Sequence, residues 1–354
     1  MSSLTLNQTP VRTSRNFKIN NIKLDNIDIP NKLDKFNNVS ISDVGTKIKI
    51  DSNIENYSLK YGIDETFTNQ VLNNSNCKLN IKIESKTEKN VEIDFKFDEF
   101  NSNLAENIQI NAMENSSSTI ILKYCSDKNV QAYHNCVIRA LAKENSKLNI
   151  IIVNFLNENT NNFISVENLL ENNSKINYYI IDLGGKNSIT NYYSNIIGEN
   201  ADNKLNAIYI GRNEQLYDLN YIAELYGKKS NIDIEVQGVL NEQAKKHFKG
   251  TIDFKKGCKK ATGNENENCM LLSKDAKSIA LPMLLCSEED VEGNHSSSAG
   301  KIGEKELFYI MSRGFELKEA MKLMVRAKFN KILENIKNDE LRNEIIEKIN
   351  EKLD

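Results

Sequence analysis

Runs of alternating apolar and polar residues fill much of the chain from about residue 45 to residue 286. Early examples are "KLNIKIE" at 78–84 and "VEIDFKF" at 91–97. Because successive side chains of a strand point to opposite faces, this alternation is typical of half-buried β-strands. The pattern therefore predicts a mainly β protein.

From about residue 110 a polar turn followed by a strand recurs at a nearly constant interval. Subtracting the positions of the first core apolar residues gives spacings of 28, 28, 29 and 27. Such a period, filled by strands and turns, predicts a solenoid of the parallel β-helix type, in which turn Asn and Ser residues stack from coil to coil. A β-sandwich is the alternative, but it does not need the same turn chemistry at a constant interval. The apolar positions are Ile120, Leu148, Ile176, Leu205 and Ile232.

The two ends of the chain follow other patterns. The first 40 or so residues have no clear period and predict an irregular region. Helical patterns occupy 304–314, which Gly314 should end, and then 316–337 and 338–353, with Asn338 or Asp339 as the cap of the last helix. We therefore expect an N-terminal region at 1–100, a β-helix core at 101–286 and a C-terminal helical unit at 287–354. The expected apolar stripe of the second helix is Ala320, Leu323, Ala327, Ile332, Leu333 and Ile336.

Composition and charge exclude several classes of function. The net charge is −3, whereas nucleic-acid binding favours a strong basic excess. No apolar run approaches the roughly 20 residues that span a bilayer, and the N-terminus lacks the apolar segment of a signal peptide. We expect a cytoplasmic protein that binds neither nucleic acid nor membrane. The six cysteines form no CxxC pair, which argues for reduced thiols and against a zinc ribbon or a ferredoxin-type site.

Catalytic motifs are missing from the sequence. "LGGKNS" at 183–188 lacks the spacing of a P-loop, so any ATPase must be another chain. No G-x-S-x-G or H-E-x-x-H motif occurs, and we expect the protein not to be an enzyme. His134 and His247 lack candidate partners nearby in the sequence and are expected to be structural.

Several motifs after residue 247 resemble the C-terminal region of the SufB/SufD family, the paired scaffold subunits of the SUF iron–sulfur assembly machinery. They occur in the family's order and spacing. The matching stretches are "FKGTIDF" (248–254), "NCMLLSKDAKSIALPMLLC" (268–286), "EDVEGNHSSSAGKIGEKELFYIMSRGF" (289–315) and "EAMKLMVRAKF" (319–329).

This resemblance implies a right-handed parallel β-helix with an N-terminal region and a C-terminal helical unit. It also implies pairing with a SufB-type scaffold through the β-helix and docking of a SufC-type ATPase through the helices. No cofactor would be bound permanently, although an iron–sulfur cluster would be shared transiently with a partner subunit.

Within the family the chain is more similar to SufD than to SufB. A SufB-like chain would carry a Cys in the turn before "MLLS", where this sequence has Glu267 or its neighbours and Cys269 is shifted along. Ser296 stands where SufB has a Glu after the His, and Gly293 stands where many SufD sequences have a Cys. The alternative within the family is a SufB-like homodimeric scaffold.

His295 is the strongest site candidate, because a neutral imidazole is a good iron ligand. The resemblance places it at the interface between the two scaffolds, where a cluster would form. The alternative is a polar or helix-capping His. Weaker candidates for an iron or cluster-assembly site are the oxygen donors Glu289, Asp290 and Glu292, for which a solvated turn is the alternative. Two cysteines are also weaker candidates: Cys269, which could pass sulfur along the solenoid, and Cys286, for which a small apolar residue buried in a strand is the alternative.

The first C-terminal helix and its turn form the second candidate site. A helix, a tight turn and a second helix suit docking to a partner, and aromatic and Arg side chains are frequent in binding hot spots. The alternative is that these residues anchor the helices to the solenoid, and we expect Phe308 to point inward. The ATPase-docking candidates are Leu307, Phe308, Tyr309, Arg313 and Gly314.

A solenoid carbohydrate-active enzyme or adhesin is the alternative from another class. Such a protein would need export and, for an enzyme, a carboxylate pair on one face of the solenoid. The N-terminal sequence and the C-terminal motifs argue against it.

Overall fold

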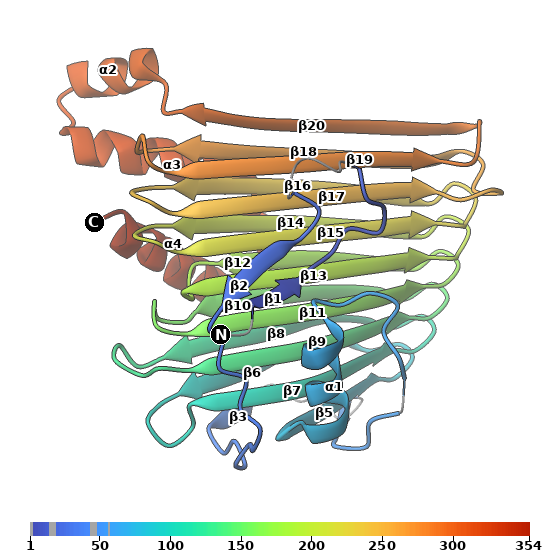
Figure 1. The fold of residues 1–354 in the computed structure, drawn as a ribbon. Coiled ribbons are helices and arrows are strands. Elements are labelled where there is room, and N and C mark those ends of the chain that lie inside the picture. Colours follow the sequence, from blue (N-terminus) through green and yellow to red (C-terminus); the bar gives the residue numbers. More distant parts are fainter. Residues whose placement is uncertain (1–2, 14–18, 43–47, 56) are drawn as a thin grey trace.

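The computed structural model describes residues 3–13, 19–42, 48–55 and 57–354. It confirms a mainly β protein built on a solenoid of about 8 turns (Figure 1). Each coil contributes one strand to each of two stacked sheets. The β20 sheet contains β3 (Val39–Ser42), β6 (Glu88–Phe97), β8 (Ser117–Ser126), β10 (Lys147–Phe155), β12 (Lys175–Asp182), β14 (Asp202–Gly211), β16 (Asn231–Leu240), β18 (Ala261–Leu271) and β20 (Val291–Lys301). The β19 sheet contains β4 (Ile48–Asp51), β5 (Cys77–Ile83), β7 (Asn103–Ala112), β9 (Tyr133–Ala142), β11 (Asn161–Leu170), β13 (Asn187–Ile196), β15 (Leu216–Leu225), β17 (Lys245–Phe254) and β19 (Lys277–Cys286).

The strands of successive coils pair in parallel, with a register close to the predicted one. Leu148 lies opposite Ile176, as the spacing predicts. Ile120 instead lies opposite Ile150, and Leu205 opposite Tyr178, so these two assignments were displaced by two residues. Side chains alternate between the two faces with period two, so a register displaced by two residues leaves each side chain on the same face. The repeat is therefore still visible in the sequence.

One turn of three successive coils repeats the predicted Asn and Ser chemistry. Asn115, Asn145 and Asn173 have φ of 58°, 57° and 53°, a left-handed conformation that Asn tolerates better than most residues. The backbone N–H of Asn145 donates to the carbonyl of Asn172 in the next coil. The Ser after the left-handed residue closes the turn, as Ser146 Oγ does on the carbonyl of Lys143 at 2.6 Å. The turns therefore stack through backbone bonds as well as through side chains.

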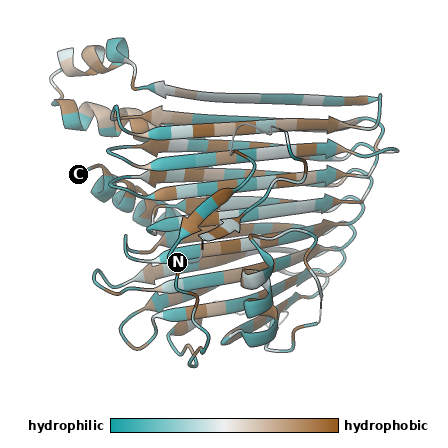
Figure 2. Cartoon of the chain, in the orientation of Figure 1, coloured by the Kyte–Doolittle hydropathy of each residue, from teal (hydrophilic) through white to brown (hydrophobic). Residues whose placement is uncertain are grey.

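The core lies between the two sheets, and alternation along the strands directs apolar side chains into it. Figure 2 shows hydrophobic and hydrophilic segments interspersed along the strands. Several interior aromatic rings meet edge to face. Tyr178 and Tyr192 do so between the two sheets at a centroid distance of 5.2 Å, and Tyr192 and Tyr221 do so between neighbouring coils at 6.0 Å.

The N-terminal region covers the outer face of the β19 sheet. It includes β1 (Ser3–Leu6), β2 (Ile22–Asp25) and a helix that the sequence did not predict, α1 (Glu65–Asn74). Leu6, Leu24 and Phe67 bury their side chains with residues of β9, β11 and β13.

The last two C-terminal helices cover the outer face of the β20 sheet (Figure 1). The helical unit is confirmed as α2 (Glu304–Ser312), α3 (Leu317–Leu333) and α4 (Asp339–Leu353). The apolar stripe of α3 was partly wrong, since Leu323 and Ala327 are exposed and Val325 and Phe329 are buried in their place. Gly314 has φ of 97°, and the Asn338 side chain accepts from the Leu341 N–H at 3.0 Å, so both helix boundaries were predicted correctly.

The solenoid sheets extend beyond residues 101–286 on both sides. β5 and β6 precede residue 101, and β20 lies inside the segment expected to be helical. In the described part of the chain, no helix has the length and apolar character needed to cross a membrane.

Candidate functional site

His295 lies in the middle of β20, the outermost strand of its sheet, opposite Glu265 of β18. Ser297 Oγ donates to the fully buried Glu267 carboxylate at 2.8 Å, whereas Ser296 Oγ donates to Asn266 at 2.7 Å on the outer face. Because side chains alternate, His295 shares the inward side with Ser297. The helix-capping alternative is wrong, since the nearest helix begins at Glu304.

A layer of charged residues lies directly beneath β20, inside the solenoid. Glu265, Glu267 and Cys269 occupy successive inward positions of β18, and all three are buried. Lys246 of β17 donates from Nζ to Glu267 Oε1 at 2.7 Å, and neither side chain is exposed. Tyr209 also donates to this oxygen, at 3.4 Å. The last coils therefore enclose a buried ion pair where the other coils have mostly apolar side chains.

The carboxyl group of Glu265 has no such partner. Burial, followed by the neighbouring charge of Glu267, raises its pKa to about 8. Within the described residues neither carboxyl oxygen accepts a hydrogen bond. The group lies against Gly250, where an added Cβ would fall 1.9 Å from Glu265 Oε2, so this close approach requires glycine. Glu265 is therefore predominantly a neutral acid at pH 7 in the free chain.

The two cysteine candidates differ in accessibility. The Cys269 thiol is buried in the charged layer, and burial raises its pKa, while the nearby Lys246 opposes that rise. Cys286 is exposed at the end of β19, so the expectation of a buried strand residue was wrong. It lines a hollow at the open end of the solenoid together with Phe254, Leu284 and Val291. Its Sγ donates to the Glu288 carbonyl at 2.9 Å.

The acidic candidates do not converge on His295. Glu289 and Asp290 lie in the turn between β19 and β20, and Glu292 is on the outer face of β20. The neighbouring Glu288 accepts from the Gly257 N–H at 2.9 Å, which lowers its pKa. Among the described residues, the one group of three potential metal ligands within 4.8 Å lies elsewhere in the solenoid.

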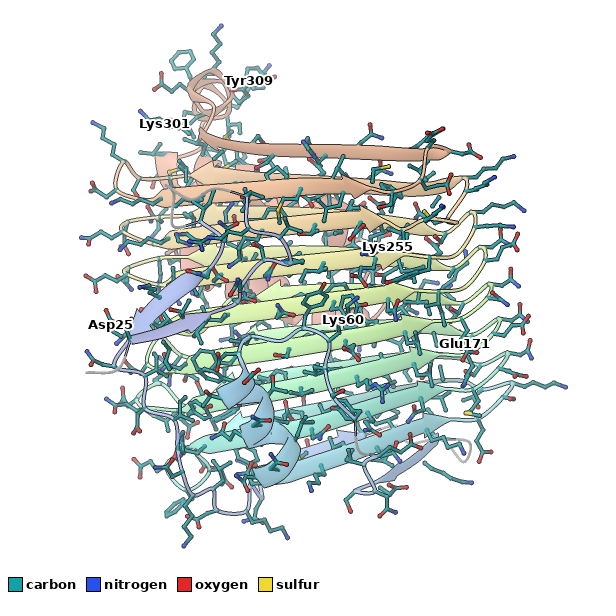
Figure 3. The ribbon with its side chains drawn as sticks, turned by 45° about the vertical axis from the view of Figure 1, so that its right-hand side comes forward. Asp25, Lys60, Glu171, Lys255, Lys301 and Tyr309 are labelled. Carbon is teal, nitrogen blue, oxygen red and sulfur yellow. The ribbon has the colours of Figure 1, made fainter. Side chains whose placement is uncertain are left out.

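Helix α2 projects beyond the end of the solenoid and has no buried residue (Figure 3). Phe308 is 74% exposed, so the expectation that it points inward was wrong. Tyr309 is 58% exposed and Leu307 is partly exposed. Arg313 donates to the Tyr309 hydroxyl at 3.1 Å and lies over its ring, 5.1 Å from the centroid. Gly314 then turns the chain into α3.

Sequence inspection missed Lys246, Glu265 and Tyr209 as members of this site. A signal was available for Lys246, because it has the same strand parity as the buried Phe248, Ile252 and Phe254. A Lys at an inward position implies a buried counter-charge. The partner could not be identified without the strand register, since Glu267 lies on another strand and in the other sheet.

Comparison with known proteins agrees with this architecture. Residues 95–328 match the family model described as SUF system FeS cluster assembly, SufBD core domain. The iron-sulfur cluster assembly protein SufD of Bacillus subtilis is 30% identical over 137 residues, which are 39% of this chain and 31% of that protein. A SufBD family protein of Pyrococcus horikoshii is 29% identical over 140 residues, 40% of this chain and 31% of the relative. SufD of Escherichia coli is 22% identical over 163 residues, 46% and 38% of the two chains.

The chain thus matches about a third of the length of these curated relatives. The family model, in contrast, covers most of the solenoid together with α2 and the larger part of α3. The chain belongs to the SufBD core domain family of the SUF system for iron–sulfur cluster assembly.

Proposed function

We propose that the chain is a non-catalytic, SufD-like scaffold subunit that pairs with a SufB-type subunit through the open end of its solenoid. The observation that carries this proposal is the uncovered last coil. β19 and β20 end their sheets, and ten of the eleven residues of β20 are exposed. Unpaired strand edges are usually blunted in monomers, because they bind other strands. Here the edge is long, and Gly293, Ser298 and Gly300 leave room for a partner backbone.

The proposed cluster-assembly site follows from this pairing. A partner strand placed along β20 would close the open end over His295. The imidazole of His295 and the thiol of Cys286 would then be available as iron ligands at the junction. The cluster would be held transiently between two subunits and then released, so no permanent cofactor is required. Cys269 lies one layer deeper and is proposed only as a secondary sulfur carrier.

Docking of a SufC-type ATPase to α2 is the second part of the proposal. The helix presents an aromatic pair next to an Arg, and none of its own residues is buried. Tyr309 is already held by Arg313, which reduces the entropy lost on binding. α3 continues from α2 onto the β20 sheet, so movement of the ATPase would reach the last coils through one connected element.

Anaerobic affinity purification of the tagged chain from its own host, with mass spectrometry of partners and an iron count, tests the proposal. We expect a SufC-type ATPase and a SufB homologue. Recovery of the ATPase with two copies of this chain and no SufB homologue would instead establish the homodimeric alternative. A lone, iron-free chain would overturn the scaffold assignment. We expect to recover the chain in the cytoplasmic fraction, and not bound to membranes or to nucleic acid.

Point variants separate the two interfaces. Phe308→Ala should lose the ATPase and retain the scaffold partner. Phe100→Ala is the matched control, because Phe100 is 92% exposed in the loop between β6 and β7, near the opposite end of the solenoid. Equal loss of the ATPase in both variants would contradict docking at α2.

A further inference from the structure

A second cluster of potential metal ligands lies inside the early coils of the solenoid, far along the stack from β20. Glu106 of β7 and His134 and Cys136 of β9 have no exposed surface. One ligand atom from each lies within 4.8 Å of the others. None of these residues takes part in the site at the open end, and the proposed scaffold role does not use them.

Parallel register explains why these side chains meet. Cys77 of β5 pairs with Glu106 of β7, which pairs with Cys136 of β9. The three side chains therefore form one inward column, with neighbouring strands about 4.8 Å apart. His134 lies two positions before Cys136 on the same face of β9. The cluster thus combines two adjacent inward positions of one strand with the stacked positions of its neighbours.

The hydrogen bonds around His134 orient its ring for ligation. Asn162 Nδ2 donates to Ser188 Oγ at 2.9 Å, and Ser188 donates in turn to Asp182 at 2.6 Å. Asn162 Oδ1 is thereby left to accept from His134 Nδ1–H, at 2.7 Å. Nε2 faces Glu106 Oε1 at 3.0 Å. A metal-bound His commonly donates its other ring N–H to an oxygen acceptor such as a carboxylate, a backbone carbonyl or water, and here the side-chain amide oxygen of Asn162 is that acceptor.

Glu106 provides an independent observation that points to a bound cation. Tyr124 donates to its Oε1 at 2.5 Å. Its Oε2 has no hydrogen-bond partner in the described part of the chain, although the residue is fully buried. An unpartnered buried carboxylate oxygen is costly unless a donor or a cation satisfies it.

We propose that Glu106, His134 and Cys136 form a buried structural site for Zn²⁺, with Cys77 the nearest residue of the column to supply a fourth ligand. Thiolate, imidazole and carboxylate are the ligand types of zinc sites. One carboxylate and one thiolate with a neutral imidazole balance the charge of the ion, which suits an apolar interior. Binding releases to solvent the thiol proton of Cys136 and the proton shared by His134 and Glu106. The ion would add a further link between these coils, beyond their sheet hydrogen bonds and the shared apolar core.

Cobalt substitution tests this site directly. The full chain would be produced in zinc-depleted medium supplied with Co²⁺, because the sealed site must fill during folding. Thiolate-to-Co²⁺ charge-transfer absorption and metal content would be measured. A His295→Ala, Cys286→Ala background removes ligands at the open end. We expect about one Co²⁺ per chain, and a Cys136→Ser variant should lose roughly tenfold or more of the absorption.

Cys258→Ser is the matched control, since Cys258 is equally buried in a later coil, and it should retain the absorption. Glu106→Gln is the second test variant, for use if Cys136→Ser does not fold. The Gln side chain has the shape of Glu and can still accept the hydrogen bond from Tyr124. This variant should also lose the metal. The absence of thiolate absorption, or equal absorption in the Glu106→Gln and control chains, would overturn the proposal. The cluster would then be a proton-sharing hydrogen-bond network.

Discussion

The middle coils and the last coil of the solenoid share one strand pattern but differ in what covers them. In β14, the outward-facing Ile208 and Ile210 are buried under the C-terminal helices. In β20, the outward-facing residues are exposed and none is a large apolar residue. The outward positions of β20 are Glu292, Asn294, Ser296, Ser298 and Gly300.

This difference shows that the polarity of the outward residues of a coil depends on whether another element packs on them. Most inward positions are apolar, because they must fill the space between the sheets, and the polar exceptions form the buried clusters described above. Outward apolar side chains gather where α3, α4 or the N-terminal region packs on the sheets. β19 is an exception, because its outward Ile279 is 38% exposed. The polar outer face and free edge of β20 therefore fit a region exposed to solvent in the free chain, as the proposed partner surface requires.

Replacing a covering aromatic side chain should have the largest effect on stability. Phe329 of α3 is fully buried against the β20 sheet. Phe329→Ala should lower the free energy of unfolding by about 3–5 kcal/mol, because it removes apolar contacts and leaves a cavity. Urea denaturation followed by circular dichroism measures this loss.

Phe308→Ala is the corresponding change in the uncovered region. Since Phe308 is largely exposed, its removal should change the free energy of unfolding by no more than about 0.5 kcal/mol. If Phe308→Ala and Phe329→Ala lowered the free energy of unfolding by similar amounts, α2 would have to pack on the solenoid in solution. That result would contradict the contrast between the covered and uncovered regions.

Breaking the buried ion pair beneath β20 should have the next largest effect. Lys246→Met leaves the Glu267 carboxylate buried without its cation. Loss of one partner of a buried pair costs about 3–5 kcal/mol. We expect the low end of this range, because Tyr209 and Ser297 still donate to Glu267.

The exposed pair between Lys229 and Glu199 is the control for this variant. Their side chains are 55% and 49% exposed, and Lys229→Met should cost at most about 1 kcal/mol. A Lys246→Met loss as small as the control's would mean that water reaches Glu267 from the open end.

Glu265 should make the last coils sensitive to pH. The pKa of its carboxyl group rises from 4.5 to about 8 on folding, chiefly because of burial. Between these values the unfolded chain ionises this group and the folded chain does not, so stability falls as pH rises through the window. Glu265→Gln should remove this loss and be more stabilising at pH 8 than at pH 5. Parallel melting curves of the two chains across this range would contradict a buried neutral Glu265.

Much of the solenoid could be predicted from the sequence, because its signals are local. Strand alternation, the recurrent Asn–Ser turns and the helix caps each depend on a few neighbouring residues. β20 escaped prediction as a strand, since "GNHSSSAG" carries no apolar alternation and the strand depends on pairing with β18. Helix α1 and the buried stripe of α3 depend on which sheet face they cover, and the sequence does not specify that contact.

The polar clusters could not be predicted for a related reason. Glu106 and Cys136 are a full coil apart, and only the parallel register brings them together. Lys246 and Glu267 belong to different sheets and meet across the interior. A register error of two residues, such as that at Ile120, is harmless for an apolar pattern. For a site it changes which side chains are neighbours.

Replacing His295 should have the smallest effect on stability but a large effect on function. Its side chain is exposed on an edge strand, so His295→Ala should change the free energy of unfolding by no more than about 0.5 kcal/mol. If the imidazole ligates iron at the junction with the partner, the same variant should impair cluster assembly in the reconstituted complex. Asn294→Ala is the control, because Asn294 is the adjacent residue on the outer face and bonds only Asn264 there at 3.1 Å. Full cluster yield from His295→Ala would leave the exposed edge as a docking surface and remove the imidazole from the proposed chemistry.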